Sequence, residues 1–244
     1  MNTTQRLMRV GLVGAVAGAL VAGSALTVGA QGSTTWNWSG QLGEGRTVYL
    51  RNLNGEVRIE QGTGNTVEVR AEKRWRRGDP DDVRIEARTA GSGSGDVLIC
   101  ALFTERATCD ENGYRGNNDR DNWKKNNDVS VSFVVKVPRN ARVDASAVNG
   151  GLVVEGTSGE IRAHTVNGGL EERSTSGRVE ANTVNGNITV RTAVPRASGV
   201  EYGTVNGSIT IELEASTAAE VDLSTVNGRI SSDFPMTLEG TINP

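Results

Sequence analysis

Residues 148–190 read VNGGLVVEGTSGEIRAHTVNGGLEERSTSGRVEANTVNGNITV, and the motif Val-Asn-Gly occurs three times within them. Two further copies follow later in the chain. The asparagines of the five copies are Asn149, Asn167, Asn185, Asn206 and Asn227, so their numbers differ by 18, 18, 21 and 21. Self-similarity with a period of about 20 residues is typical of repeat architectures. The sequence therefore predicts a protein of stacked repeats.

A second motif, Thr-Ser-Gly, lies midway between the first Val-Asn-Gly copies, at 157–159 and 175–177. The turn glycines of the two motifs are Gly150, Gly159, Gly168, Gly177, Gly186, Gly207 and Gly228. An aliphatic residue follows two positions after each glycine, as at Leu152 and Ile161, and alternation with period two is a strand signal. We therefore expect each nine-residue unit to form a short strand and a tight turn. In the turn, the glycine is expected to adopt a positive φ.

Two architectures can be built from nine-residue strand-turn units. Asn-Gly is a strong signal for a hairpin turn, which favours an antiparallel meander or barrel. The identity period favours the other architecture, because the interval between Val-Asn-Gly copies is 18 or 21, and Thr-Ser-Gly alternates with them. Coils that stack identical corners need this alternation, and a meander does not. We therefore predict an all-β chain folded as a β-solenoid, similar to a β-helix. Its coils of 18–21 residues would form single-stranded stacks, with Asn-Gly at the corners.

In such a stack the five asparagines form a ladder, in which each side-chain amide hydrogen bonds to the next coil. Residues 18 apart are also neighbours, and three such pairs carry opposite charges, as an exposed stack favours. They are Glu155 with Arg173, Glu160 with Arg178, and Arg162 with Glu180. A surface pair contributes only about 0–1 kcal/mol, so these pairs support the register more than the stability.

The chain before the repeats follows the same pattern in a weaker form. Residues 47–73 contain Asn-Gly at 54–55 and alternating runs at 56–59 and 66–69, so we expect them to form the first coil. Further strands are expected at 83–87, 96–102 and 130–137. The predicted organisation is a signal peptide at 1–30, an N-terminal segment at 31–46, and a solenoid domain at 47–244 with a polar, disulfide-tethered insertion at about 100–128.

The insertion reads DENGYRGNNDRDNWKKNND over 110–128 and is too polar for a core, so we expect a long surface loop. Its oxygen-bearing side chains suit Ca²⁺, and they are Asp110, Asn112, Asn117, Asp119 and Asp121. Their spacing matches no calcium-loop pattern, which favours a solvated loop. The repeats lack the aspartate of the calcium-binding nonapeptide. No metal and no other cofactor is predicted.

The first thirty residues have the pattern of a secretory signal. Arg6 and Arg9 precede an uncharged run at 10–28, and small residues follow, so we expect cleavage near Ala30. A spanning helix needs about 20 apolar residues, so an uncleaved anchor is the alternative. We therefore expect an extracytoplasmic protein, whether periplasmic, secreted or at the cell surface. In an oxidising compartment, Cys100 and Cys109 are expected to form a disulfide.

Charge and composition exclude some functions. The formal charge of −3 becomes −5 without Arg6 and Arg9, and no basic face is clustered, which argues against nucleic acid as a partner. No catalytic residue is predicted. Glu171 and Glu172 are adjacent and should point to opposite faces of a strand. His164 is the only histidine, and no nucleophile lies beside it in the sequence.

The Thr-Val-Asn-Gly repeats, at 165–168, 183–186, 204–207 and 225–228, resemble a bacterial domain-of-unknown-function family labelled "putative adhesin". The resemblance covers about residues 47–240, and it implies an exported β-solenoid without known catalytic residues. Chains of that family run on past Pro235 into another coil, whereas this sequence stops at Pro244. We therefore expect an uncapped last coil, whose edge can pair with another chain.

Three functions follow from these observations. The first is a binding module of adhesin type at the cell envelope, with an envelope glycan or protein as its partner. The second is an assembly protein that associates with itself through the solenoid ends. The third is an enzyme acting on polysaccharide, which needs paired carboxylates in one groove. The sequence favours the first, because its exposed carboxylates have basic neighbours one coil away.

Overall fold

The computed structural model describes residues 32–90, 95–116, 127–173, 175–191 and 199–214, together with 220, 222 and 231–233. The chain divides after Ala30 into two units, and all described residues belong to the second. The predicted all-β class is confirmed, because the regular elements of the described residues are all strands apart from one 3-10 turn at Pro80–Asp82. The expected signal peptide and the repeat of Asn227 and Gly228 lie outside the described residues.

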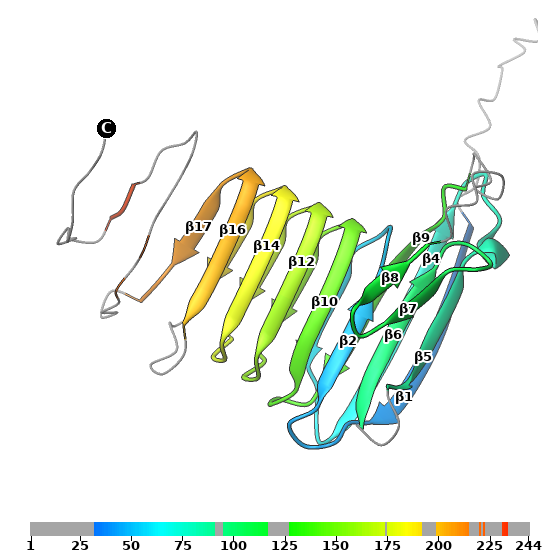
Figure 1. Cartoon of the computed structure of the whole chain (residues 1–244), viewed down its shortest axis with the longest axis horizontal. Coiled ribbons are helices and arrows are strands. Elements are labelled where there is room, and N and C mark those ends of the chain that lie inside the picture. The colour runs from blue at the N-terminus through cyan, green and yellow to red at the C-terminus, as the bar shows by residue number, and fades with distance from the viewer. Residues whose placement is uncertain are drawn as a thin grey trace, which may run out of the picture. The chain divides into compact units, whose positions relative to one another are not determined.

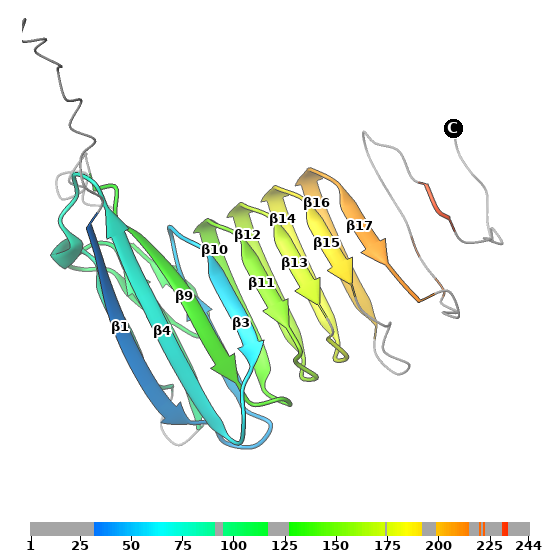
Figure 2. The same cartoon turned by 180° about the vertical axis from the view of Figure 1, so that it is seen from behind.

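Within the described residues, most strands belong to two open sheets (Figures 1 and 2). Sheet A contains, in spatial order, β1 (Gly32–Gln41), β4 (Thr66–Trp75), β9 (Ser130–Val137), β3 (Val57–Gln61), β11 (Leu152–Glu155), β13 (Leu170–Arg173), β15 (Ile188–Arg191) and β17 (Ile209–Glu212). Sheet B contains β16 (Val200–Asn206), β14 (Val179–Asn185), β12 (Ile161–Asn167), β10 (Arg142–Asn149), β2 (Thr47–Arg51), β6 (Asp96–Leu102) and β5 (Arg84–Ala90). A separate hairpin is formed by β7 (Thr108–Asp110) and β8 (Gly113–Arg115).

From β10 onwards the chain alternates between the two sheets, and from β12 onwards each strand pairs in parallel with the strand two positions earlier. Ile161 of β12 lies beside Val143 of β10, and Val179 of β14 lies beside Ile161. The numbers of paired residues therefore differ by 18, and the difference becomes 21 between Val179 and Val200 of β16. The spacing of the paired residues is the spacing of the Val-Asn-Gly motif, so identical motifs lie in neighbouring strands.

The core lies between the sheets, which face each other. Aliphatic residues such as Leu50, Ile59, Leu152 and Ile188 are fully buried there, and they alternate along each strand with outward-pointing residues. Full burial of such a side chain contributes about 1.5–3 kcal/mol. Sheet B supplies both small inward residues, as at Ala145 and Ala163, and larger aliphatic ones, as at Leu50 and Ile161. Aliphatic and alanine side chains therefore make up most of the core.

The glycines at the corners do not have the conformation that we expected. Gly150, Gly159, Gly168, Gly177, Gly186 and Gly207 are absent from the described glycines with positive φ. Their requirement for glycine comes from close stacking. A Cβ on Gly168 would lie 2.1 Å from the carbonyl oxygen of Gly150, and one on Gly186 would lie 2.0 Å from that of Gly168. Each corner therefore rests on the backbone of the corner before it, where a side chain cannot fit.

The N-terminal part forms the first repeat, and its further strands do not continue the parallel pairing of the repeats. Strands β2 and β3 pair in parallel with β10 and β11, so Val57 lies beside Leu152. The expectation that 47–73 forms one coil is wrong in its second half. The chain reverses near Gly64, which has a φ of +66°, and β4 then runs antiparallel to both β9 and β1. Alternation with period two marks a strand but does not give its direction, which is why the two cases look alike in sequence.

The other expected strands are present. Strands β5, β6 and β9 lie at 84–90, 96–102 and 130–137, close to the predicted ranges. The segment 31–46, which the sequence set apart from the solenoid, contributes β1 to the edge of sheet A. Trp36 and Trp38 of β1 pack against the core, so this segment is part of the fold.

Candidate functional site

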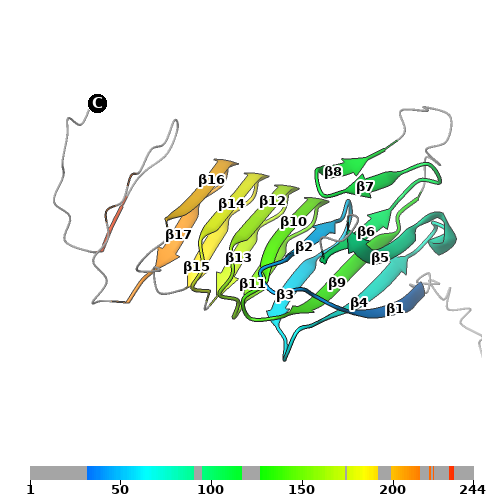
Figure 3. The same cartoon turned by 60° about the horizontal axis from the view of Figure 1, so that its bottom comes forward.

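The β7–β8 hairpin lies against the outer face of sheet B (Figure 3). The disulfide between Cys100 of β6 and Cys109 of β7 joins the hairpin to the sheet, as predicted. Leu98, Leu102 and Ala107 form a second small hydrophobic cluster with these cysteines, and Tyr49 and Tyr114 pack against it. The segment expected as a long loop from Asp110 onwards therefore begins as an ordered hairpin, because apolar residues outside the polar stretch hold it to the sheet.

Arg51 of β2 lies beneath this hairpin and is 3% exposed. Its guanidinium donates hydrogen bonds to the Asp144 carboxylate at 2.7 Å and to the Glu111 carbonyl oxygen at 2.6 Å. It also lies over the ring of Tyr49, 5.5 Å from the ring centroid. A buried charge needs such partners, and Arg51 therefore ties the turn of the hairpin to the outer face of sheet B.

One row of outward-pointing residues crosses sheet B from the hairpin to β16. In register, Cys100 is followed by Arg51, Ser146, His164, Asn182 and Gly203. The hairpin covers the first two positions of this row. Beyond it the row carries a hydroxyl, an imidazole and an amide on successive strands, and Gly203 has no side chain. The polar residues therefore form a floor that begins where the hairpin ends.

A groove of about 670 Å³ lies over this floor. It is lined by Asn52, Leu53, Tyr114, Ser146, Ala147, Val148, His164, Thr165, Val166, Asn182, Thr183, Val184, Gly203, Thr204 and Val205. None of these lining residues is an aspartate, glutamate, lysine or arginine. In a chain of which 23% of residues are charged, such a surface is unusual. A concave site with apolar walls and a few polar groups is a typical ligand site.

The apolar side of the groove comes from the valine of each Val-Asn-Gly motif. Val166, Val184 and Val205 are 38%, 39% and 74% exposed. They lie on the outer face because the strand alternation turns the preceding threonine inward: Thr165 and Thr183 are buried. Sequence reasoning missed these valines, although a β-branched apolar residue at an outward position in every repeat was a visible signal. It also assigned no role to Ser146 or Asn182.

The asparagines next to the valines are hydrogen bonded along the stack. The Nδ2 of Asn167 donates to the Oδ1 of Asn149 at 2.9 Å, and the same bond joins Asn185 to Asn167 and Asn206 to Asn185, at 2.8 Å each. Asn54 precedes them, since its Oδ1 accepts from Asn149 at 2.8 Å. Inside the corner, Thr165, Thr183 and Thr204 donate to glycine carbonyl oxygens of the preceding repeat at 2.9 Å each. These bonds hold the valine row in position.

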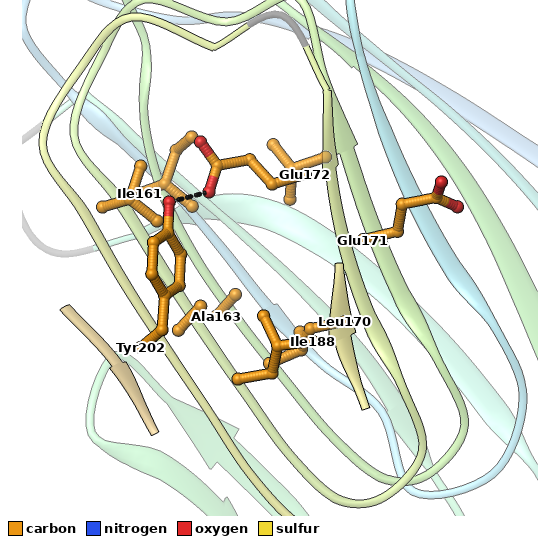
Figure 4. Close-up of a pocket in the computed structure, with 10 residues that line it drawn as sticks. Ile161, Ala163, Leu170, Glu171, Glu172, Ile188 and Tyr202 are labelled. Carbon is orange, nitrogen blue, oxygen red and sulfur yellow. Dashed lines mark hydrogen bonds between the residues drawn. The ribbon is translucent and has the colours of Figure 1, made fainter. Parts of the chain in front are cut away.

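A buried carboxyl group lies between the sheets (Figure 4). Glu172 of β13 occupies a column in which Val154 and Val190 precede and follow it, and it is 5% exposed. The Tyr202 hydroxyl donates to its Oε2 at 2.6 Å, and the Thr175 hydroxyl donates to its Oε1. Burial raises the pKa of Glu172, and these hydrogen bonds oppose the rise. Burial and the neighbouring Glu172 also raise the pKa of Tyr202.

The carboxylates considered for catalysis are engaged elsewhere. Glu171 points away from Glu172, as expected (Figure 4), and its carboxylate pairs with Arg173 at 2.6 Å and with Arg191 at 3.4 Å. The cavity beside Glu172 has a volume of only about 10 Å³ and is otherwise lined largely by aliphatic residues. It can hold at most a water molecule. The two carboxyl groups therefore do not form a pair around a common groove.

The predicted charge pairs are partly visible in the structure. Arg162 lies 3.8 Å from Glu180 in the next strand, and it also pairs with Glu160 at 3.0 Å. Glu155 lies beside Arg173 in register. For Glu160 and Arg178, the described contact between the two segments is a backbone bond, in which the Ile161 amide donates to the Arg178 carbonyl oxygen at 2.8 Å; their side-chain pair stays a prediction.

The polar insertion gives little support to a cation site. The Oδ1 of Asp110 accepts from the Asn112 backbone amide at 2.9 Å, and its Oδ2 pairs with Arg115 at 3.0 Å. Asn117, Asp119 and Asp121 lie outside the described residues. Within the part of the chain that the structure describes, no cluster of three or more His, Cys, Asp or Glu side chains could hold a metal ion. In the same part, no helix has the length and apolar character to cross a membrane.

No protein-family model and no curated protein sequence matches this chain. Among solved structures, it is similar to a "putative cell adhesion protein" from Clostridium sporogenes, with 9% sequence identity, a TM-score of 0.47, and coverage of 74% of this chain and 100% of the other. A "putative adhesin" from Parabacteroides distasonis has 9% identity, a TM-score of 0.22, and coverage of 73% and 97%. One from Bacteroides fragilis has 10% identity, a TM-score of 0.20, and the same coverage.

Proposed function

We propose that this chain is a non-enzymatic binding module of adhesin type, which works outside the cytoplasm at the bacterial cell envelope. In this proposal the repeats form a β-solenoid whose coils have the lengths of the two motif intervals, and the partner binds in the groove on sheet B. The observation that carries the proposal is the groove itself, with its polar floor of Ser146, His164 and Asn182 beside a row of exposed valines.

The surroundings of Glu171 and Glu172, the two candidate acids, support the proposal of a binding role over a catalytic one. Glu171 is paired with two arginines, and Glu172 is buried between the sheets. His164 lines the groove with Asn182 and Ser146 as its neighbours in register, and neither is an acid that could orient it. A general base must lie within hydrogen-bond reach of the proton that it removes, and among the described residues no hydrogen bond joins His164 to Ser146 or to Asn182. The proposed extracytoplasmic location is supported by the Cys100–Cys109 disulfide, since disulfides persist in oxidising compartments.

Sedimentation of the purified protein with an envelope fraction of its source cell tests this proposal. We expect saturable co-sedimentation. Asn182→Trp should abolish it, because the indole would fill the groove over Gly203, where an added Cβ would already lie 2.4 Å from the Asn182 Oδ1. Thr189→Trp is the matched control, since Thr189 is a half-buried residue on the outer face of sheet A.

Both variants should keep the far-ultraviolet circular dichroism of the parent protein, which separates a filled groove from a failure to fold. Equal binding by the parent and Asn182→Trp would remove the groove from the proposal. If the parent protein sediments with no envelope component, the binding role itself is wrong.

A further inference from the structure

We infer that the groove on sheet B binds an uncharged, linear glycan, whose chain runs along the row Ser146, His164, Asn182 and Gly203 and therefore across the strands. This inference rests on the proposed binding function and names the class of its partner. It depends on the charge, chemistry and spacing of the groove, and each of these points to the same kind of ligand.

The charge of the groove favours a neutral partner. Its described lining contains no acidic residue, lysine or arginine. In the charged row next to the floor, Asp144 pairs with Arg51 at 2.7 Å, and Arg162 pairs with Glu160 and approaches Glu180, so the cation of this row already has acidic neighbours. Glu201, beside Glu180 in register, adds a further acid and no cation. Recognition of a phosphate or carboxylate polymer is strongest where arginine or lysine lies at the contact. The groove offers neither, so a polyanion would lose its hydration there without gaining a counter-charge.

The chemistry of the groove suits sugar rings. Ser146, His164 and Asn182 provide hydrogen-bond donors and acceptors on the floor, and these match the hydroxyl groups of a glycan. The exposed faces of Val166 and Val184 lie beside them and suit the apolar C–H face of a pyranose ring. The polar floor and the apolar valines of the groove therefore match the hydroxyl groups and the C–H face of an uncharged sugar.

The spacing of the groove suits a repeating ligand. Neighbouring strands lie about 4.8 Å apart, which is close to the length of one sugar unit in an extended glycan. Each of the repeats at β12 and β14 presents one polar residue and one valine, in register. From β10 to β16 the row spans roughly 14 Å. Successive sugars can therefore make equivalent contacts along the stack, as extended ligands do on solenoid surfaces.

An extended peptide is a weaker fit. Peptides that bind to sheets usually add a strand at an edge, where free backbone groups supply most of the affinity. The floor of this groove is a sheet face between β10 and β16, and the backbone groups of β12 and β14 are already paired on both sides. A peptide lying there would receive only side-chain contacts, which makes a glycan the better partner.

The test treats the envelope fraction before sedimentation. We expect binding to be lost after periodate, which cleaves the vicinal diols of sugars, and to survive proteinase. We also expect the affinity to be unchanged between low and high salt, because a neutral ligand releases no counterions. Neutral gluco-oligosaccharides of two to eight units should compete with increasing strength until about four units, where the row ends, and oligogalacturonates of equal length should compete less.

Two variants connect the result to the groove. Val184→Ser should weaken binding about tenfold and Asn182→Ala about five- to tenfold, the loss expected for one good contact. Val134→Ser is the matched control, because Val134 on the outer face of sheet A is 36% exposed, compared with 39% for Val184. It should bind like the parent protein.

The outcomes separate this inference from the proposed function. Binding that survives periodate but is lost after proteinase would overturn the glycan and keep the binding role, as would binding that weakens steeply with salt. Binding abolished by neither treatment would also overturn the glycan. Absence of any envelope binding would instead remove the proposed function on which the inference rests.

Discussion

At the scale of single residues, the corner glycines are explained by the carbonyl group of the preceding repeat. A Cβ at Gly168 would lie 2.1 Å from the Gly150 oxygen, and its three nearest atoms all belong to the backbone of Gly150 and Gly151, which cannot move aside as a flexible side chain could. Gly199 differs, since an added Cβ there meets nothing within 4 Å and its φ is not positive. Substitution of Gly168 and Gly199 therefore compares a closely stacked corner with an open surface position.

We predict that Gly168→Ala lowers the free energy of unfolding by about 1–3 kcal/mol, the usual cost of overpacking. Gly199→Ala should leave it unchanged or slightly raised, because alanine restricts the unfolded chain. Urea unfolding followed by circular dichroism measures both. Equal stability of the two variants would mean that the corners are not closely stacked.

The buried Glu172 predicts a dependence of stability on pH. Its pKa is raised in the folded state, so the folded protein holds the proton more tightly than the unfolded chain does. The stabilisation from this proton is complete below the ordinary glutamate pKa of about 4.3, and it is lost as the pH rises through the raised value. Glu172→Gln should therefore melt at a higher temperature than the parent protein at neutral pH and at a similar temperature near pH 4.

Glu171→Gln provides the control for this experiment. Glu171 is paired with Arg173 and Arg191 on the outer face of sheet A, so its loss should lower the melting temperature slightly at neutral pH. Thermal melts of the three proteins between pH 4 and pH 8 compare the two positions. A Glu172→Gln difference that stays constant over this range would contradict a raised pKa.

At the scale of elements, the β7–β8 hairpin determines where the groove ends. It is held by the Cys100–Cys109 disulfide, by the bond from Arg51 to the Glu111 carbonyl oxygen, and by a small apolar cluster. Tyr114 of β8 contributes to the groove lining. The hairpin is therefore both a cover for the buried Arg51 and one wall of the candidate site.

We predict that replacing both Cys100 and Cys109 with serine lowers the free energy of unfolding by about 2–3 kcal/mol, the loss expected for a closed loop of this length. Amide exchange in 107–115 should become faster, while exchange in β12 and β14 stays slow. A reducing agent should reproduce the change in the parent protein and have no effect on the serine variant. Unchanged exchange in the hairpin would show that its other contacts are sufficient.

At the scale of the whole molecule, the same strand pairing recurs from one repeat to the next. Residues 18 apart lie side by side from β10 to β14, so each repeat contacts mainly the repeats before and after it. In stacked repeats, stability is approximately a sum over units and their interfaces. Removal of one complete unit should therefore leave the others able to pair.

We predict that deletion of residues 150–167, one complete repeat, yields a folded protein that unfolds cooperatively at a lower urea concentration. Asn149 is then followed by Gly168, and the motif is preserved. Deletion of residues 150–158 is the control. It removes half a repeat and places every later strand in the opposite sheet, so we expect no cooperative transition. Similar unfolding of the two variants would contradict a register set by whole repeats.

Much of this protein could be predicted from its sequence. The strands from β10 to β17, their pairing interval and the corner positions follow from the recurrence of the motifs, because residues that stack on each other must be compatible at every repeat. The disulfide followed from the compartment that the first thirty residues indicate. The antiparallel strands β1, β4 and β5 could not be placed, since an alternating pattern is the same for either direction of a strand.

The sequence by itself determined the repeat, because the repeat is local and each unit encodes its own strand and corner. The tertiary structure alone decided the candidate site. Tyr114, Arg51 and Ser146 are far apart in the chain, and only the fold of the hairpin onto sheet B brings them to one surface. The valines became a groove wall for the same reason: a strand pattern shows which residues point outward, but not what lies beside them in space.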